Sequence, residues 1–216
     1  IVVFGNIAKL STDGAPKILF YLAGITLWNY FSSCLNATST VFTANAGIFG
    51  KVYFPRLAMP ISIVLSNLMR FGVQMGLFLL IFLYYLVKGE VQPNWWILAT
   101  PFLILLMAMF ALGAGMIFSS LTTKYRDVQM LLSFGVTLYM YATPVIYPIS
   151  SLRGIFKTLA FYNPLTGIFE CFKYAWLGVG DFNVKMLLIS SAIIILILAV
   201  GTIVFNKVEK SFMDTV

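Results

Sequence analysis

Long runs without a charged side chain dominate this sequence of 216 residues. Residues 18–50, 95–123, 128–147 and 186–205 contain no Asp, Glu, Lys or Arg, and residues 57–87 contain only Arg70. A helix needs roughly 20 mainly apolar residues to cross a bilayer. The composition agrees, because 61% of the residues are hydrophobic, whereas soluble domains are about half apolar. The sequence therefore predicts an all-α polytopic membrane protein.

The connections between these runs divide the chain into six transmembrane helices in one membrane domain, residues 1–216. Residues 148–181 are too interrupted to span, and Asn163-Pro164 separates two short amphipathic stretches there. We expect these stretches to form a re-entrant helical hairpin that does not cross the membrane. The expected spans are the truncated end of a first at 1–8, then 18–45, 57–88, 95–123, 128–147 and 184–207, with a connection at 46–56 and a tail at 208–216.

The composition also excludes several kinds of chemistry. The chain has no histidine, which removes histidine triads, histidine metal sites and histidine proton switches. Cys34 and Cys171 are too far apart in the sequence to suggest a metal or redox pair. The seven acidic residues are scattered and fall near breaks between the apolar runs. We therefore expect no catalytic acid–base pair and no carboxylate inside the membrane that could couple transport to protons. We expect no catalytic residue, no metal and no cofactor in this chain.

The formal net charge of +7 is carried mainly by the connections. Basic connections are typical of membrane proteins that contact anionic lipid headgroups. A nucleic-acid partner is not expected, because no basic stripe is interleaved with exposed aromatic residues.

Polar side chains inside the apolar runs are candidates for a transport path. Asn29, Ser33 and Asn36 lie in the second expected span, and Arg70 lies inside the third. Charges inside membranes usually face a cavity or a partner. The small polar residues either line a path or hold helices together by hydrogen bonds. Arg70 either meets acidic groups of a substrate or extends its side chain to the lipid headgroups.

Aromatic residues in the fifth expected span and the hairpin form a second set of candidates. Aromatic rings pack on apolar ring faces, those of sugars among them, so such residues suit a path and an exit for a substrate of this kind. The alternative is the ordinary aromatic belt of membrane interfaces. The candidates are Tyr139 and Tyr141 for the path, and Tyr147, Phe161, Tyr162, Tyr174 and Trp176 for the exit.

Three motifs in this order resemble a known family. They are Lys51-Val-Tyr-Phe-Pro-Arg56, Lys124-Tyr-Arg-Asp-Val128, and Ala142-Thr-Pro-Val-Ile-Tyr-Pro148 followed by Tyr162-Asn-Pro-Leu-Thr-Gly167. Together they resemble the membrane subunit of bacterial polysaccharide ABC exporters, the permeases for O-antigen, capsule and teichoic acid. The segment Val208-Glu-Lys-Ser-Phe212 also fits, so the resemblance covers nearly the whole chain.

The resemblance implies a homodimeric channel in the bacterial plasma (inner) membrane for a lipid-linked polysaccharide. It places the 51–56 and 124–127 connections and the tail in the cytoplasm, and the hairpin outside. It also implies two copies of a nucleotide-binding ATPase that binds ATP and Mg, and the chain itself lacks the phosphate-loop motif. The ATPase-coupling residues implied in this way are Lys51, Tyr53, Phe54, Pro55, Arg56, Tyr125, Arg126 and Asp127.

Several of these features also fit other interpretations. The 51–56 stretch also fits a simple interfacial turn, and Arg126 and Asp127 also fit helix caps. For the whole chain, the alternatives are an ABC permease for a drug or small amphiphile, and a polytopic membrane glycosyl- or acyltransferase. The enzyme is disfavoured because the scattered carboxylates offer no convergent acid–base set.

Overall fold

The computed structural model describes residues 12–45, 57–125 and 127–213, with side chains up to residue 208. Every regular element in these ranges is a helix, and four helical stretches are long and apolar enough to cross a membrane: Lys17–Ser39, Ala58–Val87, Trp95–Lys124 and Val184–Val208. The prediction of an all-helical membrane protein is confirmed. The elements are α1 (Lys17–Ser39), α2 (Val41–Ala44), α4 (Ala58–Val87), η2 (Trp95–Ala99), α5 (Thr100–Lys124), α6 (Val128–Ala142), η3 (Ile149–Ser151), α7 (Ile155–Tyr162), α8 (Thr166–Leu177) and α9 (Val184–Met213).

Helix α6 is shorter than the span expected at residues 128–147. It has 15 residues and ends at Ala142, because Thr143 adopts an extended conformation with φ −103° and ψ 142°. Thr143 precedes Pro144, and the proline ring disfavours the helical conformation of the residue before it. Four full-length candidates and one short apolar helix are therefore described, rather than five full spans.

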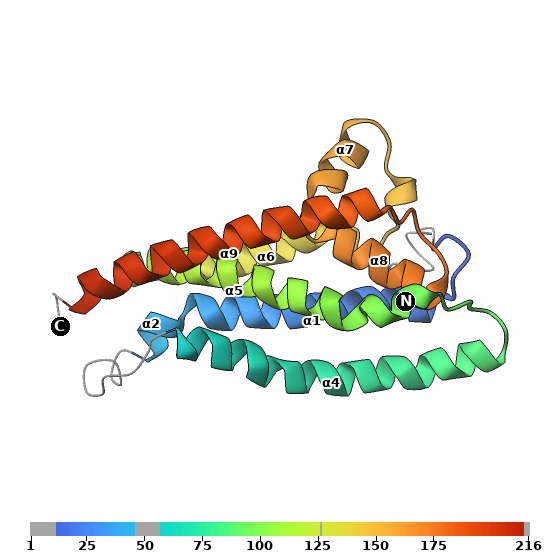
Figure 1. Ribbon diagram of the computed structural model, residues 1–216, viewed down its shortest axis with the longest axis horizontal. Helices are drawn as coiled ribbons and strands as arrows, with labels where there is room; N and C mark the ends of the chain where they lie inside the picture. Colours follow the sequence, from blue (N-terminus) through green and yellow to red (C-terminus); the bar gives the residue numbers. More distant parts are fainter. Residues whose placement is uncertain (1–11, 46–56, 126, 214–216) are drawn as a thin grey trace.

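The long helices pack around α5, which contacts α1 on one side and α9 on another, while α1 also contacts α4 and α6. Figure 1 shows α2 and the end of α9 at one end of the bundle, and α7 and α8 at the other. We call these the α2 end and the α8 end. The start of α4 also lies at the α2 end, so α1 and α4 run antiparallel.

Helices α5 and α9 approach each other at a pair of glycines. A Cβ atom on Gly113 would lie 2.7 Å from Leu198 Cα, and one on Gly201 would collide with the carbonyl oxygen of Gly113. Small residues allow such close helix contacts inside membranes. By contrast, Cβ atoms on Gly72 and Gly76 of α4 would meet nothing within 4 Å.

Two short helices lie between α6 and α9, separated at Asn163-Pro164 as the sequence predicts. Helix α8 is buried along nearly its whole length and ends at Leu177, followed by Gly178, whose φ of 72° is left-handed. Helix α7 exposes Ile155, Phe156 and Leu159 and projects from the bundle in Figure 1. The two helices therefore have different environments, one inside the protein and one at its surface.

Candidate functional site

One face of α1 is exposed and polar in the half of the helix nearest the α2 end. Asn29 and Ser33 are exposed and Asn36 is half-buried, and their spacing places them on one side of the helix. Trp28 packs against Tyr139 of α6, whereas Tyr30 packs against Phe71 of α4. Asn29 stands between these two residues in the sequence, so the polar side of α1 faces outward between α4 and α6.

A second polar row runs along α4. Ser62, Ser66, Arg70 and Gln74 follow one another at intervals of four residues, and all but the half-buried Gln74 are exposed. Asn29 Nδ2 donates a hydrogen bond of 3.4 Å to Gln74 Oε1. This contact joins the rows of α1 and α4, and it places Arg70 one turn from the junction, toward the α2 end.

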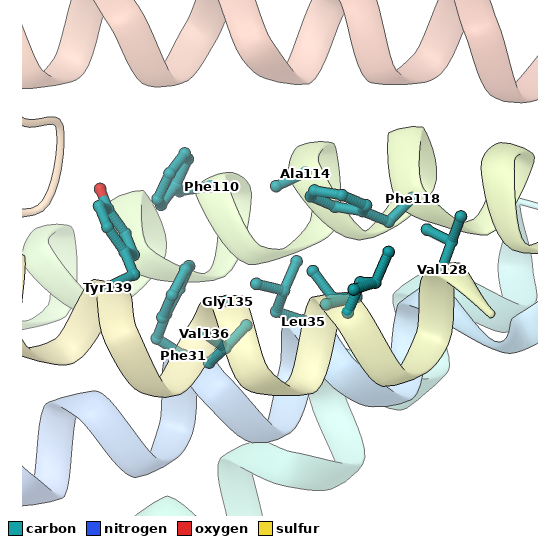
Figure 2. Close-up of a pocket in the computed structure, with 11 residues that line it drawn as sticks. Phe31, Leu35, Phe110, Ala114, Phe118, Val128, Gly135, Val136 and Tyr139 are labelled. Carbon is teal, nitrogen blue, oxygen red and sulfur yellow. The ribbon is translucent and has the colours of Figure 1, made fainter.

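A third polar row lies on α6. Gln129, Ser133, Thr137 and Tyr141 are exposed at four-residue spacing. Ser133 Oγ donates to the carbonyl of Gln129 and Thr137 Oγ1 to that of Ser133, both at 3.0 Å. Figure 2 shows Val136 beside Phe31 of α1, and the polar row occupies the flank of α6 next to Val136.

These three rows together form what we call the polar face. It contains the predicted path residues Asn29, Ser33, Asn36, Arg70 and Tyr141, and it adds residues that had not been selected from the sequence. Their signal was the four-residue spacing of small polar side chains within apolar helices. The added residues are Ser62, Ser66, Gln74, Gln129, Ser133 and Thr137.

A cavity of about 480 Å³, the α5–α6 groove, lies on the other flank of α6. Figure 2 shows its walls, with Phe110, Ala114 and Phe118 of α5 facing residues of α6. Phe31 and Leu35 of α1 close its base. Its lining is apolar except for the hydroxyl group of Tyr139.

A second cavity, of about 570 Å³, lies between the end of α6 and α7. Tyr141, Tyr147, Phe156 and Asn163 contribute to its lining. Tyr147 donates its hydroxyl hydrogen to the carbonyl oxygen of Tyr141 at 3.0 Å, which fixes the two aromatic residues relative to each other. We call this cavity the α7 pocket.

The other predicted exit aromatics do not line this pocket. Phe161 and Tyr162 pack edge to face on α7, with ring centroids 5.6 Å apart, and Tyr174 stacks on Phe182 at 5.5 Å. Trp176 differs from the expectation for an exit residue, because it is only 9% exposed. Its ring contacts Phe78 and Phe82 of α4, and its indole N–H donates to Thr100 Oγ1 at 3.0 Å. Trp176 therefore belongs to the packed interior.

Asn163, at the break between α7 and α8, links the hairpin to α6. Its Oδ1 accepts a hydrogen bond from the Tyr139 hydroxyl at 2.7 Å and one from the Leu165 backbone N–H at 3.0 Å. Its Nδ2 donates to Thr143 Oγ1 at 3.1 Å. The path candidate Tyr139 is thus half-buried and occupied in holding the hairpin to α6.

A buried ion pair lies within α8, and its lysine also joins α8 to the segment after α6. Lys173 is 1% exposed and Glu170 is fully buried, and Lys173 Nζ lies 3.7 Å from Glu170 Oε1. Lys173 also donates to the carbonyl oxygens of Pro144 at 2.6 Å and Tyr147 at 3.3 Å. Burial raises the pKa of Glu170 and lowers that of Lys173, because a charged group loses its hydration in the interior. Pairs at i, i+3 are common on exposed helices, so the sequence gives no sign of this burial.

The residues implied for ATPase coupling are described only in part. Tyr125 is exposed at the end of α5, where Lys124 Nζ lies 5.4 Å from the centroid of its ring. Asp127 is exposed at the start of α6, and its carbonyl oxygen accepts hydrogen bonds from the N–H groups of Met130 and Leu131. The other predicted coupling residues lie outside the described residues: Lys51, Tyr53, Phe54, Pro55, Arg56 and Arg126.

The chain is similar to several curated transport proteins. It is 28% identical over 196 residues to the O-antigen export system permease protein RfbA of Klebsiella pneumoniae, a match that covers 91% of this chain and 74% of the relative. It is 23% identical to the RfbA permease of Myxococcus xanthus, over all of this chain and 82% of that protein. The inner membrane transport permease YadH of Escherichia coli K12 is 22% identical, with coverage of 97% and 82%.

These relatives are transport permeases rather than enzymes, as the sequence had indicated. The model of the ABC-2 type transporter membrane family matches residues 2–177, which include α1, α4, α5, α6, α7 and α8. The resemblance based on the three motifs is confirmed at the level of the family. This chain belongs to the ABC-2 type transporter membrane family.

Proposed function

We propose that the chain is the permease subunit of an ATP-driven exporter that moves a lipid-linked polysaccharide across the bacterial inner membrane. Two copies form the channel in this proposal, and the re-entrant hairpin lies at its outer end. Relatives named as O-antigen export permeases support the substrate class.

The polar face is the observation that carries the proposal. A surface of exposed amides, hydroxyls and one guanidinium is unfavourable against hydrocarbon, where polar groups have no water to bind. A polysaccharide offers many hydroxyl groups as hydrogen-bonding partners along its whole length. In the proposed dimer, the polar faces of two copies line a common path, and the exposed Arg70 meets the phosphate or acidic sugars of the substrate.

The α7 pocket fits the exit of such a path. Tyr141 and Tyr147 present aromatic rings held in place by their hydrogen bond, and Asn163 adds an amide. Aromatic rings pack against the apolar faces of sugars without demanding one particular sugar. The polysaccharide would therefore pass over Tyr141 after it has moved along α6.

The energy in this proposal comes from two copies of a nucleotide-binding subunit that bind ATP and Mg. The family of ABC-2 type transporters supports such a partner. The exposed Tyr125 and Asp127 lie at the α2 end, opposite the hairpin, where the partner would bind in the cytoplasm. The residues 51–56 are proposed as part of the same contact.

Export of a small amphiphile is the second candidate function. The α5–α6 groove is an apolar cavity of about 480 Å³, a size typical of small-molecule sites. YadH, named only as a transport permease, is also among the relatives. A drug exporter predicts that apolar compounds stimulate ATP hydrolysis by the complex, whereas a polysaccharide exporter predicts that they do not.

The proposal is tested by replacing Arg70 with glutamine and measuring polysaccharide on the cell surface. A hydrogen bond to a charged group contributes about 1.5–3 kcal/mol, so export should fall about tenfold or more. Met69→Leu is the matched control, because Met69 is the exposed neighbour outside the polar face. Normal export by Arg70→Gln at a normal protein level would contradict the role of the polar face. Failure of any ATPase subunit to co-purify from intact membranes would contradict the exporter itself.

A further inference from the structure

The α5–α6 groove is suited to an apolar occupant. Four aromatic rings and several aliphatic side chains form its walls. The hydroxyl of Tyr139 already donates a hydrogen bond to Asn163. No other hydroxyl, amide or charged side chain lines the groove among the described residues, so a sugar or a polar drug would lose its hydrogen bonds to water on entry.

The dimensions of the groove select a single hydrocarbon chain. It follows α6 from Val128 to Tyr139, a length of about 16 Å at 1.5 Å per residue. Its volume of about 480 Å³ then gives a mean cross-section of about 30 Å². A transmembrane helix with its side chains needs roughly 80–110 Å². A hydrocarbon chain in van der Waals contact needs roughly 15–20 Å², and two side by side need roughly 30–40 Å². One chain with methyl branches therefore fits the groove more easily than two.

Two exposed charged residues, Lys124 and Asp127, lie beyond one end of the groove. Phe118 and Val128 line the groove at its end nearest the α2 end. Lys124 is the last residue of α5 and is exposed, and it follows Phe118 by about 9 Å along the helix axis. An apolar groove that ends at an exposed cation complements a lipid with a phosphate at the end of its hydrocarbon chain.

We propose that the α5–α6 groove binds the polyprenyl chain of a lipid carrier, with the carrier phosphate near Lys124. This inference rests on the proposed function, because the carrier is the anchor of the exported polysaccharide. A polyprenyl phosphate has one branched chain and one phosphate end, as the groove and Lys124 require. Helix α6 then separates the two parts of the substrate, with the lipid chain on its apolar flank and the sugars on the polar face.

Gly135 gives a sharp test, because it lines the groove and a Cβ there would meet nothing within 4 Å. Gly135→Leu therefore fills the groove without displacing a neighbour. Gly72→Leu is the matched control, since Gly72 on α4 has equally open surroundings. Ala114→Leu fills the groove from the wall of α5, in case one variant fails to insert into the membrane. Lys124→Gln removes the positive charge alone.

The probe is undecaprenyl phosphate with a diazirine on its chain, added to the permease complex in nanodiscs without ATP. Photolabelled protein is measured by intact mass, and the labelled peptides are identified. We expect labels on α5 and α6 in the wild type and in Gly72→Leu. Gly135→Leu and Ala114→Leu should lose about tenfold or more of this labelling, because the buried chain contacts are removed. For Lys124→Gln, labelling should fall severalfold at low salt and by a smaller factor at high salt, because salt screens the attraction between the lysine and the phosphate.

A phosphatidylglycerol with a diazirine on one acyl chain distinguishes the carrier from bulk lipid. It carries the same kind of charge but two chains, so it should label the groove weakly and compete poorly with the polyprenyl probe. Equal labelling of Gly135→Leu and the wild type would overturn the proposal. Equal labelling of the groove by phosphatidylglycerol would overturn it too, by assigning the groove to bulk lipid.

Labelling without ATP also separates this inference from the proposed function. If the probe occupies the groove but Arg70→Gln exports normally, the lipid site stands and the role of the polar face fails. If Arg70→Gln abolishes export while the probe ignores the groove, the exporter stands and the lipid site fails.

Discussion

Lys173 and Glu170 form an ion pair one turn apart on α8, 3.7 Å between Nζ and Oε1, with both side chains removed from solvent. The ammonium group also lies 4.2 Å from the centroid of the Phe20 ring on α1. The side chain of Lys173 thus contacts Glu170 on α8, Phe20 on α1 and the segment that follows α6. The contacts of this charge hold α8 inside the protein, whereas α7 stays at the surface.

Replacing Lys173 with methionine should destabilise the protein strongly. Methionine keeps much of the volume but leaves the Glu170 carboxylate buried without its partner, and breaking a buried pair costs about 3–5 kcal/mol. The measurement is thermal unfolding of the purified protein in detergent. The double variant Glu170→Gln with Lys173→Met should recover much of this loss, because it leaves no buried charge. If the double variant is as unstable as Lys173→Met, the pairing explanation is wrong.

The same lysine should make stability depend on pH in the alkaline range. Burial lowers the pKa of Lys173 from 10.5 to about 8. Between these values the unfolded chain keeps a proton that the folded chain has released, so the free energy of unfolding rises with pH from about 8 to about 10.5. Below that interval the lysine is protonated in both the folded and the unfolded chain, so it no longer makes stability depend on pH. Comparing the unfolding temperature at pH 7.5 and 9.5 in wild type and Lys173→Met isolates this effect, and an identical change in both would contradict it.

Asn163→Ala should loosen the attachment of α7 to α6. The substitution removes three hydrogen bonds and leaves the hydroxyl of half-buried Tyr139 without its acceptor, at a cost of about 1–3 kcal/mol. We expect faster amide hydrogen exchange in α7 and at residues 143–148. Asn183→Ala is the control, since Asn183 caps the start of α9 through a similar bond to the Lys185 N–H. Its effect should be confined to α9.

Glycine-to-alanine substitutions should have opposite effects on α5 and α4. Gly113→Ala forces its Cβ against the backbone of α9, and such overpacking costs about 1–3 kcal/mol. Gly72→Ala meets no neighbour and should leave the unfolding temperature unchanged or raise it, because alanine favours a helix over glycine by about 1 kcal/mol. Equal unfolding temperatures for the two variants would show that α5 and α9 are not in close contact.

Much of the fold follows from local rules that act along the chain. The uncharged runs predict helices of membrane length, and Asn163-Pro164 predicts the break between α7 and α8. The end of α6 also follows such a rule, but at Pro144 rather than at Pro148, where the expected span stopped. Both prolines lie in one motif, and the first one decides where the helix ends.

The site is harder to predict from the sequence than the fold. Whether a residue is exposed depends on which face of its helix is covered by other helices. Asn29, Ser33 and Arg70 stand out as polar residues in apolar runs, and they are exposed on neighbouring helices. Trp176 and Tyr147 look alike in the sequence, yet α4 covers Trp176 and Tyr147 lines a pocket. Such differences arise from long-range packing, which residue spacing does not encode.

The short length of α6 explains why a charge is buried beside it. Its 15 residues extend only about 22 Å, whereas the hydrocarbon core is about 30 Å thick. The backbone is extended at Thr143, so the carbonyl groups after it have no partners within a helix. Lys173 supplies hydrogen-bond donors to two of them, Pro144 and Tyr147. A side chain that looks like an electrostatic liability thus takes the place of water at the carbonyl groups of a segment that has left its helix inside the protein.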